Sequence, residues 1–245
     1  MTIKVKICGI QTLEAAQAAS DAGADFLGFN FVRSSKRYIR LETAKEIIEE
    51  LKMEYSCHCE PRAKQSRPNV LKPNGIAAVR CTSDLAMTTN HRLQVKTVGV
   101  FQNEKLDLAN KLISYLKLDY VQLHGNESPE YISLIQGTGI IKSFSLDADF
   151  DLEETMKKIS KYKADYILLD RKKQGRGELL NLDKVSRLTK LFPIILAGGL
   201  YPENVSRVLS IAKPYAVDVA GGVEVNGKKD KEKIVQFIKL AKNYE

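Results

Sequence analysis

Apolar stretches of strand length alternate with stretches of helical periodicity along this chain of 245 residues. Eight short apolar runs are typical of buried β-strands. Eight segments that follow these runs repeat their apolar residues every three or four positions, which indicates amphipathic helices. The expected strands span residues 3–8, 26–31, 95–101, 120–124, 140–146, 166–170, 193–198 and 216–219. The expected helices span residues 12–22, 41–51, 106–116, 129–135, 152–161, 182–191, 203–209 and 231–241.

This succession of strand–helix units predicts an α/β fold, a single (β/α)8 TIM barrel domain over residues 1–245. An open, doubly wound parallel sheet is the alternative, because periodicity counts elements and does not establish closure. No G-x-G-x-x-G motif follows the first expected strand, so a dinucleotide-binding fold lacks its main signature. In a barrel the chemistry lies where the strands end, so the residues that close each apolar run are the candidates for a site.

An irregular segment over residues 54–92 interrupts the alternation and has no sustained period. It holds three of the chain's seven prolines. A structureless stretch of this length inside a compact domain indicates an insertion. It lies between the second helix and the third strand, so we expect a flexible insertion on the N-terminal face of the barrel. The metal-ligating residue types in it are Cys57, His58, Cys59, Cys81 and His91. Their spacing is not that of a structural zinc site, so no metal is predicted.

Composition and charge narrow the class of protein. The chain is 44% hydrophobic and 28% charged, as in ordinary soluble domains. It contains no apolar run near the ~18 residues of a membrane span and no signal peptide, so we expect a cytoplasmic protein without cysteine bridges. The net charge is +8, but the lysines are spread along the helices rather than gathered in one block. That distribution favours solubility or attraction of a small anionic substrate over binding of nucleic acid.

Cys8 and Asp170 are the candidates for catalysis. Cys8 ends the first expected strand, and it is either a buried small hydrophobe or a general base whose pKa a nearby cation lowers. Asp170 follows four apolar strand residues, where a carboxylate is unfavourable unless it faces a polar site. There it would suit a general acid, provided that partial burial raises its pKa. The alternative for Asp170 is a helix cap or a partner of Arg171 or Lys172.

Further polar residues at strand ends could bind a substrate. Arg37 lies in the loop after the second strand, where it is either a surface arginine or a bidentate donor to a carboxylate. Gln122 and His124 alternate along the fourth strand, so both side chains point to the barrel interior. Hydrogen bonding to a substrate would explain two polar side chains there, although a single histidine at a strand end is often structural.

Small residues follow the last two expected strands and could bind phosphate. Gly198 and Gly199 come after the seventh strand, and Ala220 and Gly221 after the eighth. Bare backbone amides at a strand–helix junction bind anions, and barrels often place a phosphate site at these two loops. Either turn alone could be a simple tight turn. Together they predict a small phosphorylated substrate.

Seven motifs in the right order resemble those of the phosphoribosylanthranilate isomerase family of tryptophan biosynthesis, over residues 3–52 and 95–241. They are VKICGI, GFNFVRSSKRYI, VGVFQNE, VQLHGNESPEYI, YILLD, ILAGGLYPENV and VDVAGGVEVNGKKD. The resemblance implies that Cys8 is the general base, Asp170 the general acid and Arg37 the residue against the anthranilate. It places the phosphate site on Gly198, Asp218, Ala220 and Gly221.

The implied reaction is an Amadori rearrangement of N-(5-phospho-β-D-ribosyl)anthranilate to 1-(2-carboxyphenylamino)-1-deoxy-D-ribulose 5-phosphate. It has no redox step, so the resemblance implies no cofactor. The family includes both monomers and homodimers, and either is expected here. The chain departs from the family pattern at Ala220 and Gly221, where serines are usual, and in the loop 173–177.

Two further interpretations stay open at this point. One is another phosphate-binding barrel, such as an indole-glycerol-phosphate synthase or a pentose-phosphate epimerase. The synthase needs a catalytic lysine at an early strand end, and Lys6 is a poor candidate because it precedes Cys8 on the same inward face. The epimerase needs metal-binding histidines, of which the chain has few. The other is a decayed or repurposed barrel, which the insertion and the basic balance make conceivable.

Overall fold

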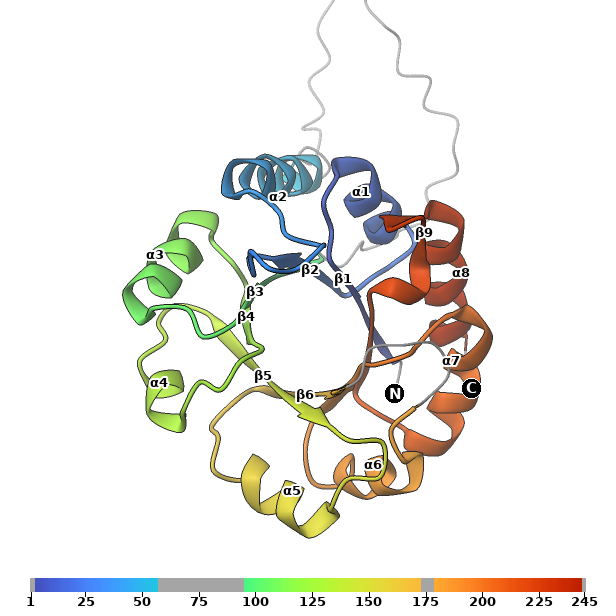
Figure 1. Ribbon diagram of the computed structural model, residues 1–245. Helices are drawn as coiled ribbons and strands as arrows, with labels where there is room; N and C mark the ends of the chain where they lie inside the picture. The colour runs from blue at the N-terminus through green and yellow to red at the C-terminus, as the bar shows by residue number, and fades with distance from the viewer. Residues whose placement is uncertain (1–2, 57–94, 173–178, 244–245) are drawn as a thin grey trace, which may run out of the picture.

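Eight parallel strands close into a barrel, and the helices surround it (Figure 1). The computed structural model describes residues 3–56, 95–172 and 179–243. Each strand pairs with the next along the chain, and the last pairs with the first through Lys6 and Asp218. The strands are β1 (Lys4–Cys8), β2 (Phe26–Asn30), β3 (Lys96–Phe101), β4 (Tyr120–Leu123), β5 (Gly139–Leu146), β6 (Tyr166–Arg171), β7 (Ile194–Leu196) and β8 (Ala216–Val219). The predicted TIM barrel is confirmed.

A helix follows each barrel strand, as the periodicity predicts. The helices are α1 (Leu13–Asp21), α2 (Leu41–Ser56), α3 (Leu106–Leu116), α4 (Pro129–Ser133), α5 (Leu152–Ile159), α6 (Leu182–Leu188), α7 (Pro202–Ala212) and α8 (Lys231–Lys242). A 3-10 turn, η1 (Gly221–Val223), and a short hairpin of β9 (Glu224–Val225) and β10 (Lys228–Lys229) lie between β8 and α8.

Local signals explain where several elements begin and end. Thr12 caps α1 by accepting a hydrogen bond from the backbone N–H of Ala15, and Asp230 caps α8 in the same way. Proline at the first helical position starts α7 one residue before the predicted start. The strand β7 ends earlier than predicted because Gly198 and Gly199 turn the backbone with φ of 85° and 74°.

The predicted irregular segment begins too early. Residues 54–56 continue α2, which ends at Ser56 and not at residue 51. Residues 57–92 of the predicted insertion lie outside the described residues. Its predicted place on the N-terminal face therefore stays a prediction. It is consistent with the topology, because α2 ends and β3 begins at that end of the barrel.

Successive side chains along each strand point alternately out of and into the barrel, so they belong to two separate cores. Outward side chains such as Val121 and Leu123 join the large apolar layer between strands and helices. Inward side chains near the strand starts form a smaller cluster inside the barrel. There the ring of Phe26 packs edge-on against those of Tyr120 and Tyr166, with centroids 5.7 and 6.0 Å apart. These rings fill the N-terminal end of the barrel and leave the other end for polar groups.

A buried ion pair fixes the loop after β4. The Lys142 ammonium donates to Glu127 Oε2 at 2.7 Å and to the backbone carbonyl oxygens of Leu123 and Gly125 at 3.2 and 2.7 Å. Both charged side chains are almost fully buried. Glu127 also accepts hydrogen bonds from the backbone N–H groups of Asn103 and Gly125. The pair thus ties the ends of β3 and β4 to the middle of β5.

Removing one partner of this pair should destabilise the protein strongly. Glu127→Ala leaves the Lys142 ammonium buried without its counter-charge, which costs about 3–5 kcal/mol of unfolding free energy. Urea denaturation followed by circular dichroism measures the loss. Glu49→Ala is the control, because Glu49 is exposed and pairs with Lys45 at 3.9 Å on the surface of α2. Its removal should cost less than about 1 kcal/mol. Equal losses in the two variants would contradict the importance of the buried pair.

Candidate active site

A buried ion pair crosses the seam at which the barrel closes. Lys6 Nζ on β1 donates to Asp218 Oδ1 on β8 at 3.0 Å, and the Lys6 side chain is fully buried. Burial opposes the charged form of Lys6, yet the charge of Asp218 and the proximity of Cys8 raise the pKa of this ammonium above its ordinary value. Lys6 therefore stays protonated inside the barrel.

Cys8 lies above Lys6 on the same inward face of β1 and is buried. Burial raises the pKa of the Cys8 thiol above its ordinary value. The positive charges of Lys6 and Lys229 act in the opposite direction, while the carboxylate of Asp218 adds to the rise. Both features expected of Cys8 are therefore present. The side chain is buried, as a small hydrophobic residue would be, and it has cations beside it, as a general base requires.

Gly28 on β2 makes room for these two groups. A Cβ atom at this position would lie 2.9 Å from Cys8 Sγ and 3.1 Å from Lys6 Nζ. Both distances are shorter than van der Waals contact, so only glycine lets the sulfur and the ammonium share this space. Sequence reasoning missed Gly28, although a glycine inside a strand is a known sign of close approach.

Asp170 and His124 form a second, weaker pair at the ends of β6 and β4. His124 Nε2 lies 3.8 Å from Asp170 Oδ2, and Asp170 Oδ1 accepts the backbone N–H of Arg171 at 2.8 Å. Burial raises the pKa of Asp170 and lowers that of His124, and the attraction between the two groups only partly opposes these shifts. Each environment therefore shifts its group toward the uncharged form, the carboxylic acid for Asp170 and the neutral imidazole for His124.

Gln122 orients the imidazole. Its amide N–H donates to His124 Nδ1 at 3.1 Å, so the neutral ring carries its proton on Nε2, which faces Asp170. The predicted inward direction of Gln122 and His124 is confirmed by this contact. The amide oxygen of Gln122 is buried without a hydrogen-bond partner among the described residues, as is the hydroxyl of Ser143 on β5. The amide oxygen can accept a hydrogen bond from a ligand inside the barrel, and the hydroxyl can accept or donate one.

Arg37 reaches the site but is already paired. Its Nε and Nη2 donate to the two carboxylate oxygens of Glu224 at 2.6 and 3.0 Å. Lys229 Nζ donates to the same carboxylate at 2.9 Å and to the carbonyl oxygen of Ala220 at 2.8 Å. Burial opposes ionisation of Glu224, but its two cationic partners lower its pKa below the ordinary value. Sequence reasoning missed Glu224, since its pairing with Arg37 joins segments 187 residues apart, and it also missed Lys229, which binds the same carboxylate.

The two small-residue turns touch each other. A Cβ at Gly222, in the turn after β8, would collide with the carbonyl oxygen of Leu200, in the turn after β7. Gly198 also lies against one catalytic candidate, because a Cβ there would sit 2.8 Å from Asp170 Oδ1. The structure thus brings together the two turns that carry the predicted phosphate residues. Gly198 lies beside Asp170, and Gly221 lies beside Arg37, since a Cβ there would be 3.0 Å from Arg37 Nη2. Asp218 is different in kind: its carboxylate holds Lys6, and its negative charge does not favour a phosphate.

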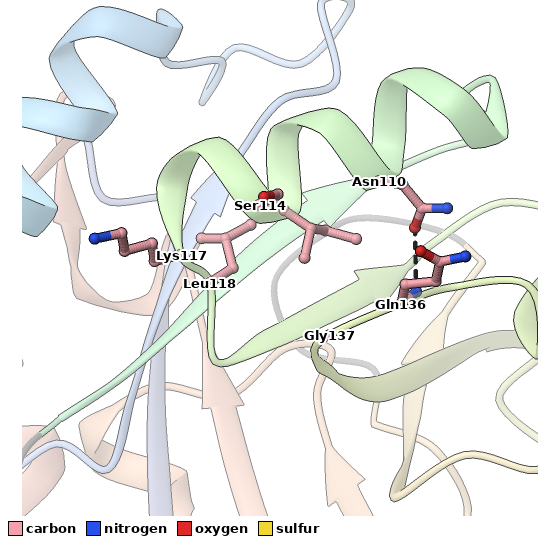
Figure 2. Close-up of a pocket in the computed structure, with 7 residues that line it drawn as sticks. Asn110, Ser114, Lys117, Leu118, Gln136 and Gly137 are labelled. Carbon is pink, nitrogen blue, oxygen red and sulfur yellow. Dashed lines mark hydrogen bonds between the residues drawn. The ribbon is translucent and has the colours of Figure 1, made fainter.

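A pocket elsewhere on the surface has no part in this arrangement. It has a volume of about 470 Å³ and lies between α3 and the segment before β5 (Figure 2). A hydrogen bond from the backbone N–H of Gln136 to Asn110 Oδ1, 3.2 Å long, closes one side. Its remaining lining includes Lys117 and Gly137, near the strand starts and remote from Cys8 and Asp170.

The described residues contain no cluster of three or more His, Cys, Asp or Glu side chains that could hold a metal ion. The five candidate zinc ligands of the sequence lie outside those residues. No helix within the described ranges has the length and apolar character to span a membrane.

Comparison with known proteins gives a consistent picture. A sequence profile described as N-(5'phosphoribosyl)anthranilate (PRA) isomerase matches residues 66–240. An N-(5'-phosphoribosyl)anthranilate isomerase of Citrifermentans bemidjiense is 36% identical over 98% of this chain and 97% of its own length. A crystal structure of monomers generated from the dimeric Thermotoga maritima phosphoribosylanthranilate isomerase superposes with a TM-score of 0.71 and 31% identity, covering 98% of both chains.

A further solved structure holds a ligand. It is a phosphoribosyl anthranilate isomerase in complex with reduced 1-(o-carboxyphenylamino)-1-deoxyribulose 5-phosphate. It is 32% identical to this chain, with a TM-score of 0.71 over 98% of both chains.

The pairing of His124 with Asp170 can be tested by titration. We expect NMR to give His124 a pKa below the ordinary histidine value, because burial disfavours the imidazolium. Asp170→Asn should lower this pKa further, since the carboxylate is the main group that opposes the shift. The resonance is assigned by its loss in His124→Asn, because the chain has three histidines. Asp107→Asn, which removes an exposed carboxylate on α3, is the control. A rise of the His124 pKa in Asp170→Asn would refute the pairing.

Proposed function

The chain belongs to the N-(5'-phosphoribosyl)anthranilate isomerase family, and from this premise we propose that Cys8 and Asp170 carry its isomerase reaction in tryptophan biosynthesis. The substrate is N-(5-phospho-β-D-ribosyl)anthranilate, and the product is 1-(2-carboxyphenylamino)-1-deoxy-D-ribulose 5-phosphate. The observation that supports this assignment most strongly is that the two candidates have different neighbours. The buried carboxyl group of Asp170 lies beside a neutral imidazole, and the thiol of Cys8 lies beside an ammonium.

Asp170 acts as the general acid. Burial raises its pKa, so its protonated form is more populated near neutral pH than that of an exposed aspartate. It donates this proton to the ring oxygen of the ribose, and the C1–O bond breaks to give an open-chain Schiff base. The neutral His124 beside it adds no positive charge that would favour ionisation of the acid.

Cys8 acts as the general base. Its thiolate removes the proton from C2 of the Schiff base, and the electron pair moves to give an enolamine. The enolamine then becomes the ketone by losing the hydroxyl proton at C2 and gaining a proton at C1. One proton returns to the enzyme and one leaves it in this last step, so both catalytic groups regain their starting forms.

Arg37 and the small-residue turns bind the two anionic groups of the substrate. Glu224 uses two donors of the Arg37 guanidinium and thereby fixes its plane, so its remaining N–H groups can bind the carboxylate of the anthranilate. The phosphate binds at the adjoining turns after β7 and β8, the second of which also lies beside Arg37, because a Cβ at Gly221 would be 3.0 Å from Arg37 Nη2. Bare amides of Gly198, Gly199, Ala220 and Gly221 are suited to this anion.

The alternatives from the sequence are less well supported. A synthase lysine would have to be free at a strand end, whereas Lys6 is buried and paired with Asp218. A repurposed barrel would have no reason to keep buried charges around Cys8 and Asp170. A homodimer agrees with the Thermotoga maritima relative that is described as dimeric, and the cytoplasmic location stays a prediction.

Turnover of freshly generated phosphoribosylanthranilate, followed by the loss of anthranilate fluorescence, tests the catalytic pair. Cys8→Ala and Asp170→Ala should each lower kcat by at least about 100-fold, because each removes a group that transfers a proton. Asp107→Ala is the control for removal of a carboxylate and should leave turnover unchanged. If either catalytic variant keeps turnover while remaining folded, that residue loses its assignment.

Loss of the arginine should act on substrate binding. Arg37→Ala should lower kcat/KM by about 10- to 100-fold, as expected for a lost charged hydrogen bond. Most of the effect should appear as a higher KM. Arg37→Lys keeps the charge but not the bidentate contact with Glu224. Its kcat/KM should therefore lie between that of the parent protein and that of Arg37→Ala. An unchanged KM in Arg37→Ala would show that the anthranilate carboxylate binds elsewhere.

A further inference from the structure

Lys6 is a buried charged group that the reaction steps above do not use. An ammonium inside a protein is unfavourable unless it is paired, and a leucine or isoleucine would fill the same strand position without this penalty. Lys6 has one carboxylate partner, Asp218, at 3.0 Å. It lies two residues before Cys8, so both side chains point into the barrel.

The space around Lys6 is shaped for contact with Cys8. Gly28 on the neighbouring strand offers no side chain where Sγ and Nζ both approach within about 3 Å of the missing Cβ position. Gly28 is paired with Cys8 in the parallel register of β1 and β2. A larger residue at Gly28 would separate the sulfur from the ammonium.

The charges that face Cys8 come from four elements. Lys6 lies on β1, Asp218 on β8, Lys229 on β10 and Arg37 in the loop after β2. Lys6 is the strongest of the groups that favour the thiolate, and it acts through both its charge and a side-chain hydrogen bond. Asp218 acts against the thiolate, so its contribution to Cys8 is indirect: it keeps Lys6 charged.

We propose that Lys6 is a positioning residue for Cys8: its ammonium, held by Asp218, fixes the sulfur in the barrel interior and stabilises the thiolate that serves as the base. The inference rests on the proposed function, in which Cys8 removes the C2 proton. It also assigns Asp218 to the base rather than to the phosphate.

The two catalytic groups need opposite protonation states at the same time. Cys8 must be ionised while Asp170 is protonated, although a thiol is ordinarily the weaker acid of the two. When the pair holds one proton, most molecules therefore keep it on Cys8, and the reactive arrangement is the minority. Each unit by which Lys6 lowers the pKa of Cys8 increases that minority about tenfold.

Alkylation of Cys8 by iodoacetamide tests the contact without any turnover. The background carries serine at Cys57, Cys59 and Cys81, so that Cys8 is the sole thiol. In Lys6→Met the rate of alkylation should rise with pH at a higher pKa than in the parent. Lys142→Met is the matched control: it also removes a buried, carboxylate-paired lysine, but Lys142 is not among the groups that act on Cys8. It should leave the pKa of the thiol unchanged.

The pH profile of kcat/KM separates positioning from simple damage. At the plateau, Lys6→Met should be at least about tenfold slower, matching a rise of one unit in the thiol pKa. Its alkaline limb should move to higher pH by the same amount. At pH values above the thiol pKa of both proteins, the rates of variant and parent should converge. There Cys8 is ionised in both, so the fraction of reactive molecules depends only on whether Asp170 holds its proton. A structural defect would instead lower the rate by one factor at every pH.

Lys6→Met leaves Asp218 unpaired, so Lys6→Met/Asp218→Asn serves as a second variant without either charge. It should also show a raised thiol pKa, by less than Lys6→Met, since Asp218 acts against Lys6. An unchanged thiol pKa in both variants overturns the proposal. A raised thiol pKa with an unchanged pH profile supports the contact and removes Cys8 from its role as base, so the two failures are distinguishable.

Discussion

The buried cations of this site are each held by a carboxylate. Lys6 is paired with Asp218, and Arg37 and Lys229 share Glu224. Without these partners the desolvation of each group would cost several kcal/mol. The partners are distant in sequence: Lys6 and Asp218 are 212 residues apart, and they meet only because β8 pairs with β1. Closure of the barrel and assembly of the site are therefore one event, and each stabilises the other.

The fold was predictable because its signal is local. The spacing of apolar residues within each strand and helix indicates which element it forms, and caps such as Thr12 mark where helices begin. The candidates Cys8 and Asp170 were found for a related reason, since a reactive residue at the end of an apolar run is visible in a short window. Closure itself is not local, so the open sheet could be dismissed only from the register of β1 with β8.

The pairing inside the site was not predictable from the sequence. Glu224 follows a short 3-10 turn with no periodicity, and its contact with Arg37 spans 187 residues. Lys6 did carry a signal, a lysine alternating with cysteine in an apolar strand, but only as a poor candidate for a different chemistry. Asp218 was assigned to phosphate by resemblance, whereas the geometry gives it a cation to hold. The sequence pattern thus identifies which residues are unusual, but the contacts of each residue can be learned only from the three-dimensional structure.

The rings at the strand starts have a consequence for how such a protein changes over time. Phe26, Tyr120 and Tyr166 pack together where the strands begin, and Tyr215 stacks on Tyr166 with centroids 4.8 Å apart. They fill the barrel between its polar interior and the strand starts. Chain length there can drift without disturbing the chemistry. The end with the strand starts can therefore accept changes that the reactive end cannot.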